Sequence, residues 1–205
     1  MRRFMKVVVP TDGYEKVKKI GSKWLIHLEG TSTGEPSDAL VECYECVVDE
    51  EPDLTVLGEE LAEWKTFIAG KELGNAKQTR IVELTAYDKS GAVDSFELRR
   101  DGQKIIDYWI NRDLRPSLEG DVKAAKEVGD TYDFDVRELG ITLTLDCDKF
   151  LAALSVLRRY AYTCFNVTSR HMASINALQT VEDVRGYDFT IGYPQKLVFN
   201  IEELV

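Results

Sequence analysis

The sequence predicts an α+β protein in three parts: a β-rich N-terminal region (residues 1–54), a helical connector (55–89) and a C-terminal α+β domain (90–205). Three observations lead to this division. Short runs rich in β-branched residues dominate the first part. Apolar residues at intervals of three and four follow in the second. The third contains two hairpin patterns and a long amphipathic helix, so we expect antiparallel hairpins packed with that helix.

The N-terminal region is expected to form four strands. The runs FMKVVV, YEKVKKI and KWLIHLEG are separated by the turn signals PTDG and GS, and ALVECYECVV follows as an alternating strand. Residues 31–38, TSTGEPSD, contain nothing for a core, which predicts a loop. Pro52 prevents the fourth strand from continuing.

The connector has a helical pattern in which Leu57, Leu61 and Trp64 share one face. Gly70 and Gly74 interrupt it, and glycine costs about 1 kcal/mol relative to alanine inside a helix. The sequence therefore predicts either two helices or one helix that bends at the glycines.

The C-terminal domain begins with a hairpin, VDSFELRRDGQKIIDYW, whose Asp101-Gly102 suits a tight turn. A helix is expected from a cap near Asn111 to a stop at Gly129. A second hairpin, TYDFDVRELGITLTLDCD, precedes a long helix over 148–178. The aromatic tail is irregular and is expected to end in a strand at KLVFNI.

The long helix carries one cysteine and one of the two histidines of the chain on its apolar stripe. Cys164 and His171 are seven residues apart, so their backbones are separated by about 10 Å. A nucleophile and its base must approach to about 3 Å. We therefore interpret Cys164 and His171 as residues that pack in the core rather than as a catalytic pair. The stripe comprises Phe150, Leu154, Leu157, Ala161, Cys164, Thr168, His171, Ile175 and Leu178.

The C-x-x-C sequence at Cys43 and Cys46 lies inside a strand pattern rather than at a helix N-terminus, where a redox pair would belong. Strand alternation places the two cysteines on opposite faces. A second pair of zinc ligands is not spaced appropriately. Ordinary strand residues are the favoured interpretation.

The second hairpin has an acidic face. With its turn at Glu138-Leu139, the register pairs Asp135 with Thr142 and Asp133 with Thr144. Carboxylates opposite threonines avoid like-charge repulsion, which indicates a solvated sheet face. A calcium or catalytic carboxylate site is the alternative, although the sequence contains no EF-hand pattern.

Composition argues against several functions. The net charge of −10, with no compensating basic run, disfavours binding to nucleic acid. The apolar runs are too short for a signal peptide or a membrane span, so a cytosolic chain with reduced thiols is expected. P-loop, G-x-G-x-x-G, G-x-S-x-G and H-E-x-x-H motifs are absent. We therefore expect no enzyme activity, catalytic residue, metal or cofactor.

Residues 86–205 resemble a domain-of-unknown-function family encoded in prophages of gut bacteria and beside tail fibres in other tailed phages. Three segments carry the resemblance: AYDKSGAVDSFEL, YWINRDLRPSLEGDVKAAKEVG and ALSVLRRYAYTCFNVTSRHMASINALQTVEDVRGYDFTIGYPQKL. The chain departs from the family in a longer first hairpin and in a second hairpin without the usual Trp and Gly-Gly turn. The matching positions are Tyr87, Asp88, Ser90, Ala92, Val93, Ser95, Phe96, Trp109, Cys164, Phe165, Asn166, Thr168, Tyr187, Asp188, Phe189, Thr190, Gly192, Tyr193 and Pro194.

The resemblance implies a structural or assembly protein of a phage tail or tail fibre, located in the virion or in the host cytoplasm during assembly. Its expected partners are other tail or fibre proteins, not nucleic acid or membrane, and a homo-oligomer is left open. Tyr187, Phe189, Tyr193 and Phe199 are taken as exposed aromatic residues suited to partner binding. A phage protein that binds or inhibits a host component is the alternative, followed by a hydrolase with an unrecognised carboxylate site.

Overall fold

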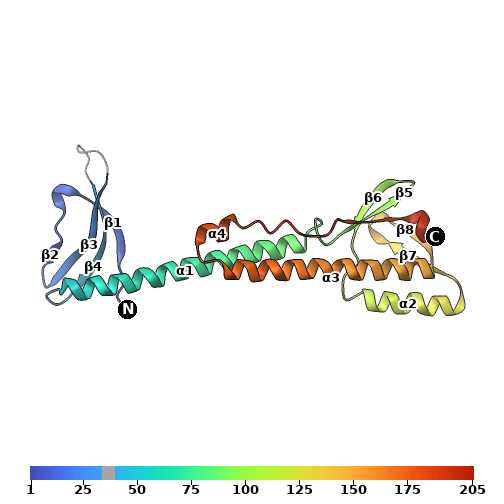
Figure 1. Ribbon diagram of the computed structural model, residues 1–205, viewed down its shortest axis with the longest axis horizontal. Coiled ribbons are helices and arrows are strands. Elements are labelled where there is room, and N and C mark those ends of the chain that lie inside the picture. The colour runs from blue at the N-terminus through green and yellow to red at the C-terminus, as the bar shows by residue number, and fades with distance from the viewer. Residues whose placement is uncertain (34–39) are drawn as a thin grey trace. The chain divides into compact units, whose positions relative to one another are not determined.

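The computed structural model describes residues 1–33 and 40–205 (Figure 1). Its helices and antiparallel and mixed sheets confirm the expected α+β class. The chain divides into two compact units, Met1–Gly74 and Asn75–Val205. The helix expected as a connector contributes residues to both units.

The N-terminal unit is a four-stranded antiparallel sheet with the order β1-β4-β3-β2. Its last element is the first part of the helix α1, Leu54–Asp88. The strands agree with the four expected from the sequence. They are β1 Met5–Pro10, β2 Val17–Ile20, β3 Lys23–Thr33 and β4 Leu40–Val48, with a 3-10 turn at Thr11–Gly13.

The loop expected over 31–38 is wrong in its first three residues. Thr31 to Thr33 continue β3, because each pairs with a residue of β4 after a register shift that follows Leu28. Threonine suits this extended pairing through its branched Cβ. Residues 34–38 of the expected loop lie outside the described residues.

One face of the sheet packs on the first turns of α1, because the 3.6-residue period brings Leu57, Leu61 and Trp64 to the same side. This packing completes a core that the strands alone would leave open. The cluster contains Phe4, Ile26, Leu28, Cys46, Val48, Leu57 and Leu61, with Val17, Trp24, Tyr44, Leu54 and Trp64 at its margin.

The connector is one continuous helix, and both Gly70 and Gly74 lie inside it. Strong helix formers lie between the two glycines, in KEL (71–73), and after them, in AKQ (76–78). Their propensity accommodates the two interruptions that led us to consider two helices.

The C-terminal unit combines a three-stranded sheet, β6-β5-β9, with a two-stranded hairpin, β7-β8. The first hairpin turns at Asp101 and Gly102, both with positive φ, as the sequence predicts. The strands are β5 Phe96–Arg100, β6 Gln103–Tyr108, β7 Thr131–Val136, β8 Ile141–Asp146 and β9 Leu197–Asn200, with a 3-10 turn at Arg137–Leu139.

The second hairpin has the expected register, with Asp133 opposite Thr144 and Asp135 opposite Thr142. The strand at the end of the tail is also confirmed, but it pairs with β5 in parallel, which the sequence did not indicate. The helices are α2 Arg115–Val128, α3 Cys147–Ala177, α4 Val181–Gly186 and α5 Ile201–Leu204.

The expected cap at Asn111 is wrong, because α2 begins at Arg115. The carbonyl of Asn111 instead accepts hydrogen bonds from the amides of Leu114 and Arg115, which form a turn before the helix. Pro116 fits the first turn of the helix, where its missing N–H is not needed.

Helix α3 agrees with the long helix expected over 148–178 and begins at a cap in which the Asp146 carboxylate accepts from the amide of Lys149 (2.9 Å). Its N-terminal half packs under both sheets. The core there comprises Phe96, Leu98, Ile110, Val122, Val136, Leu143, Leu145, Cys147, Phe150, Leu154, Leu157, Ile201 and Leu204.

Candidate functional site

A hydrogen-bonded cluster joins three parts of the C-terminal unit: the end of α1, the C-terminal half of α3 and the segment 187–193. We call it the Asp88–His171 network. One hydrogen-bonded group contains Asp88, Thr168 and Tyr193, and a second contains His171 and Tyr187. The rings of His171 and Tyr193 connect the two groups, with a centroid distance of 5.9 Å. The end of α1 lies alongside α3, and the C-terminal segment returns along the pair (Figure 1). Residues distant in sequence therefore meet at one place.

His171 uses both nitrogens of its ring. Nε2 lies 2.9 Å from the carbonyl oxygen of Ile191, and Nδ1 lies 2.8 Å from the hydroxyl of Tyr187. A carbonyl can only accept, so Nε2 carries a proton, and in the neutral ring Nδ1 accepts from Tyr187. His171 is 9% exposed. The imidazole thus fixes the C-terminal segment to α3.

Thr168 lies one helical turn before His171 and holds the other half of the network. Its hydroxyl donates to a carboxylate oxygen of Asp88 at 2.5 Å and lies 2.8 Å from the hydroxyl of Tyr193. A hydroxyl has one proton, and the charged acceptor forms the stronger bond, so Tyr193 donates to Thr168. Burial raises the pKa of the Tyr193 phenol, which keeps it a donor.

Aromatic and cationic side chains surround these polar groups. The ring of Tyr87 contacts those of Phe189 and Tyr193, with centroid distances of 5.8 and 5.6 Å. Arg80 places its guanidinium 4.4 Å from the Phe189 ring centre and donates from Nε to the carbonyl of Tyr187 at 3.1 Å. Both contacts hold the C-terminal segment against α1.

None of the four aromatic residues taken as partner-binding is fully exposed on the surface of the unit. Phe189 is buried, and Tyr187, Tyr193 and Phe199 are half-buried. The expectation that they are exposed is wrong, because each packs against a partner within the chain. Phe199 pairs with Phe96 at a centroid distance of 5.1 Å.

The four thiols are all buried and free. Burial raises the pKa of the Cys164 thiol to about 11, so at neutral pH it is a protonated, weakly nucleophilic group. Burial also raises the pKa values of Cys43 and Cys46. In this environment the cysteines act as small apolar residues.

A second buried polar contact lies near the network. The Arg115 side chain, 8% exposed, donates from Nε to the Ile110 carbonyl at 2.7 Å and stacks 4.5 Å from the ring centre of Trp109. Burial and the nearby Asp88 raise the pKa of Asp94, which the Arg115 charge opposes. These contacts fix the turn before α2.

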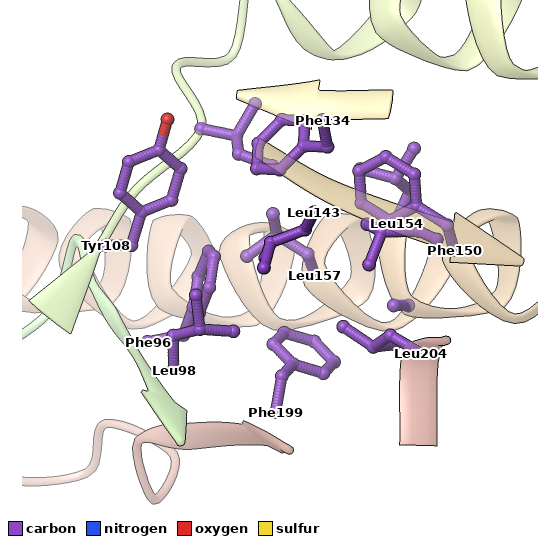
Figure 2. Close-up of a pocket in the computed structure, with 13 residues that line it drawn as sticks. Phe96, Leu98, Tyr108, Phe134, Leu143, Phe150, Leu154, Leu157, Phe199 and Leu204 are labelled. Atoms are coloured by element: carbon purple, nitrogen blue, oxygen red, sulfur yellow. The ribbon is translucent and has the colours of Figure 1, made fainter. Parts of the chain in front are cut away.

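The core of the C-terminal unit contains a cavity of about 30 Å³ (Figure 2). Phe96, Phe134, Phe150 and Phe199 project toward it from three strands and α3, and its lining is almost entirely apolar. Ligand pockets for small molecules measure roughly 300–1,000 Å³. This cavity is a packing void rather than a ligand site.

The described residues contain no group of three or more His, Cys, Asp or Glu side chains that could hold a metal ion. Within residues 1–33 and 40–205, no helix combines the length and apolarity needed to cross a membrane. Two carboxylates on the acidic face of the second hairpin accept hydrogen bonds from the opposite strand. Thr142 donates to Asp135 and Thr144 donates to Asp133, both at 2.7 Å.

No protein-family model, curated protein or solved structure matches the chain. The functional argument therefore depends on the residues themselves. The sequence drew attention to His171 and Tyr187 separately, but it did not indicate their contact or the contact between Asp88 and Thr168. One signal in the sequence pointed to this network. Thr168 and His171 are polar residues on the apolar stripe of α3, and a buried polar side chain needs a hydrogen-bond partner.

Proposed function

We propose that the chain is a non-enzymatic protein of a phage tail or tail fibre, and that it acts through contacts with other tail proteins. The observation that carries this proposal is the convergence of the segments that resemble the phage family. Tyr87 and Asp88 come from the first segment, Thr168 from the third, and Tyr187 and Tyr193 from its end. They form one packed unit, which supports reading the segments as a single fold signature.

The chemistry of the network also supports a structural role. His171 uses both nitrogens, and Thr168 uses its proton and accepts from Tyr193, all for bonds within the chain. Groups satisfied in this way stabilise one conformation of the C-terminal segment. A rigid module of this kind suits a protein that assembles with others.

The N-terminal sheet supplies a surface suited to such contacts. Its edge strand β2 carries Lys18 and Lys19, which discourage pairing with another strand. The opposite edge, β1, contains Val7, Val8 and Val9, and its one lysine is paired with Glu42. Pro10 ends this edge and blocks pairing there, so strand addition by a partner would use the stretch from Met5 to Val9.

The decisive experiment is quantitative mass spectrometry of purified phage particles from the encoding strain, with the infected-cell lysate measured in parallel. Stoichiometric copies in the particle would support a virion component. Presence in the lysate alone, together with co-purification with a tail or fibre protein, would support an assembly factor. Absence from particles and from every tail-protein complex would contradict the proposal and direct attention to a host component as the partner.

A further inference from the structure

The charge of α3 differs from that of the rest of the chain. The protein has 36 acidic and 26 basic residues, yet no Asp or Glu occurs between Asp148 and Glu182. The same stretch contains Arg158, Arg159 and Arg170. Most of α3 is therefore a positive helix in an acidic protein.

The arginines share the solvent side of α3 with two exposed aromatic residues. Tyr162 is 66% exposed and Phe165 is 57% exposed. Positions 159, 162 and 170 fall on one side because they are separated by three and eight residues, and position 165 borders them. We define the α3 outer face as Arg159, Tyr162, Phe165 and Arg170.

This face is free of contacts that would explain its composition. Arg158 pairs with Glu119 of α2, but Arg159 and Arg170 form no ion pair with any residue that the structure describes. The opposite side of α3 is buried through Leu157, Cys164 and His171. The outer face is thus held in a fixed position by a well-packed helix.

Arginine beside tyrosine and phenylalanine is the composition enriched at the centre of protein–protein interfaces. The aromatic rings supply apolar area at little entropic cost, and the guanidinium groups recognise carboxylates with two parallel hydrogen bonds. Single exposed aromatic residues need no explanation. Two of them lie along the helix between unpaired arginines, on a part of α3 that has no acidic residue after Asp148. Together they make a surface of complementary charge for a carboxylate-rich partner.

We infer that the α3 outer face binds an acidic segment of another protein. This inference depends on the proposed function for one point, that the partner is a protein. It adds that the segment bound by the face is rich in carboxylates. Nucleic acid is disfavoured because the acidic remainder of the chain repels an extended polyanion, whereas a short acidic segment can contact the face alone.

The test measures binding of the full chain to defined probes by fluorescence anisotropy. The probes are a short fluorescein-labelled peptide of repeated Asp, Glu, Phe and Leu, the same peptide with Asn and Gln in place of the acids, and single-stranded DNA of equal charge. The test variants are R159E/R170E and Y162A/F165A. The matched control is R112E/R185E, which changes the net charge equally at two exposed arginines that are not part of α3.

We expect the acidic peptide to bind the wild-type chain more tightly than the neutral peptide, by about tenfold or more. Each test variant should weaken that binding by about tenfold, while the control stays within about twofold of wild type. Circular dichroism checks that the variants keep their helix content, and R159A/R170A replaces the charge reversal if that variant misfolds.

Equal binding of the two peptides, or equal loss in the control variant, would overturn the inference. Tighter binding of the DNA than of the acidic peptide, lost in R159E/R170E, would identify a nucleic-acid surface instead. Self-association abolished by the same substitutions would assign the face to a second copy of the chain and also overturn it. The particle measurement is independent of these outcomes, so failure of the phage proposal and failure of this surface are distinguishable.

Discussion

The Nδ1 atom of His171 in α3 lies 2.8 Å from the hydroxyl of Tyr187, and the opposite ring nitrogen binds the carbonyl of Ile191 at 2.9 Å. One side chain therefore fixes the C-terminal segment at two points. The segment between α4 and β9 forms no helix or strand, so it has no regular backbone hydrogen bonds to hold it in place. The two bonds from His171 help to hold it instead.

Replacing His171 with leucine should destabilise the C-terminal unit by about 1–3 kcal/mol, because it leaves the Ile191 carbonyl and the Tyr187 hydroxyl without their partner. Urea denaturation followed by circular dichroism measures the change. Tyr187→Phe removes only one of the two bonds and should cost less, about 1 kcal/mol. Equal stability of wild type and His171→Leu would show that the segment is held by other contacts.

Thr168 provides a sharper comparison, since valine has nearly the same shape without the hydroxyl. Thr168→Val leaves Asp88 without its donor and Tyr193 without its acceptor, so we expect a loss of about 1–3 kcal/mol in the free energy of unfolding. Thr168→Ser keeps the hydroxyl and should lie closer to wild type. If serine and valine destabilise equally, the methyl group rather than the hydrogen bonds accounts for the effect.

The local elements could be predicted from the sequence because their signals are local. The register of β7 and β8 follows from the alternation of Tyr132 and Phe134 with Asp133 and Asp135, and the length of α3 follows from its apolar period. The turn at Asp101-Gly102 follows from the φ angles that these residues tolerate.

The remaining features depend on partners distant in the chain. Asp88 and Thr168 are 80 residues apart, and β9 pairs with β5 although most of the sequence of the C-terminal unit lies between the two strands. Tyr187 and Phe189 looked exposed because their segment has no period, yet they pack on α3 and α1 through side-chain contacts that no pattern encodes. The α3 outer face was also missed, although the lack of acids between Asp148 and Glu182 is visible in the sequence.

Alkaline pH should destabilise the C-terminal unit through Cys164 and Tyr160. Burial raises the pKa of Cys164 from 9.0 to about 11 and also raises that of Tyr160. Both groups bind their proton more tightly in the folded state than in the unfolded state. Their contribution to the free energy of unfolding is therefore complete below the pKa of the unfolded state, and it is lost as the pH rises through the pKa of the folded state. Thermal denaturation between about pH 8 and pH 11 should show a falling midpoint.

The variant Cys164→Ala isolates one of these two groups. It removes the buried thiol, so the loss of stability between about pH 9 and pH 11 should be less steep than in wild type. A difference in unfolding free energy between the two proteins that is the same at every pH would contradict the assignment. Slow reaction of the native thiols with a thiol reagent, and fast reaction after unfolding, provides an independent check.

Gly30 in β3 allows a steric prediction for the N-terminal unit. A Cβ at this position would lie 2.8 Å from Cζ of Tyr14 and 3.0 Å from Cγ1 of Val41, closer than packed carbons allow. The Tyr14 ring cannot move freely because it stacks on His27 at a centroid distance of 5.6 Å. Gly30→Ala should therefore cost about 1–3 kcal/mol through overpacking.

A double-mutant cycle separates this clash from a general effect on strand β3. Tyr14→Ala removes the ring, so Gly30→Ala should cost less in that background, with a coupling of about 1 kcal/mol or more measured by urea denaturation of the N-terminal unit. Additive costs would mean that the backbone of β3, rather than the Tyr14 ring, rejects the added methyl group. Because Tyr14 also packs on His27, the cycle reports whether glycine at position 30 makes room for that stack.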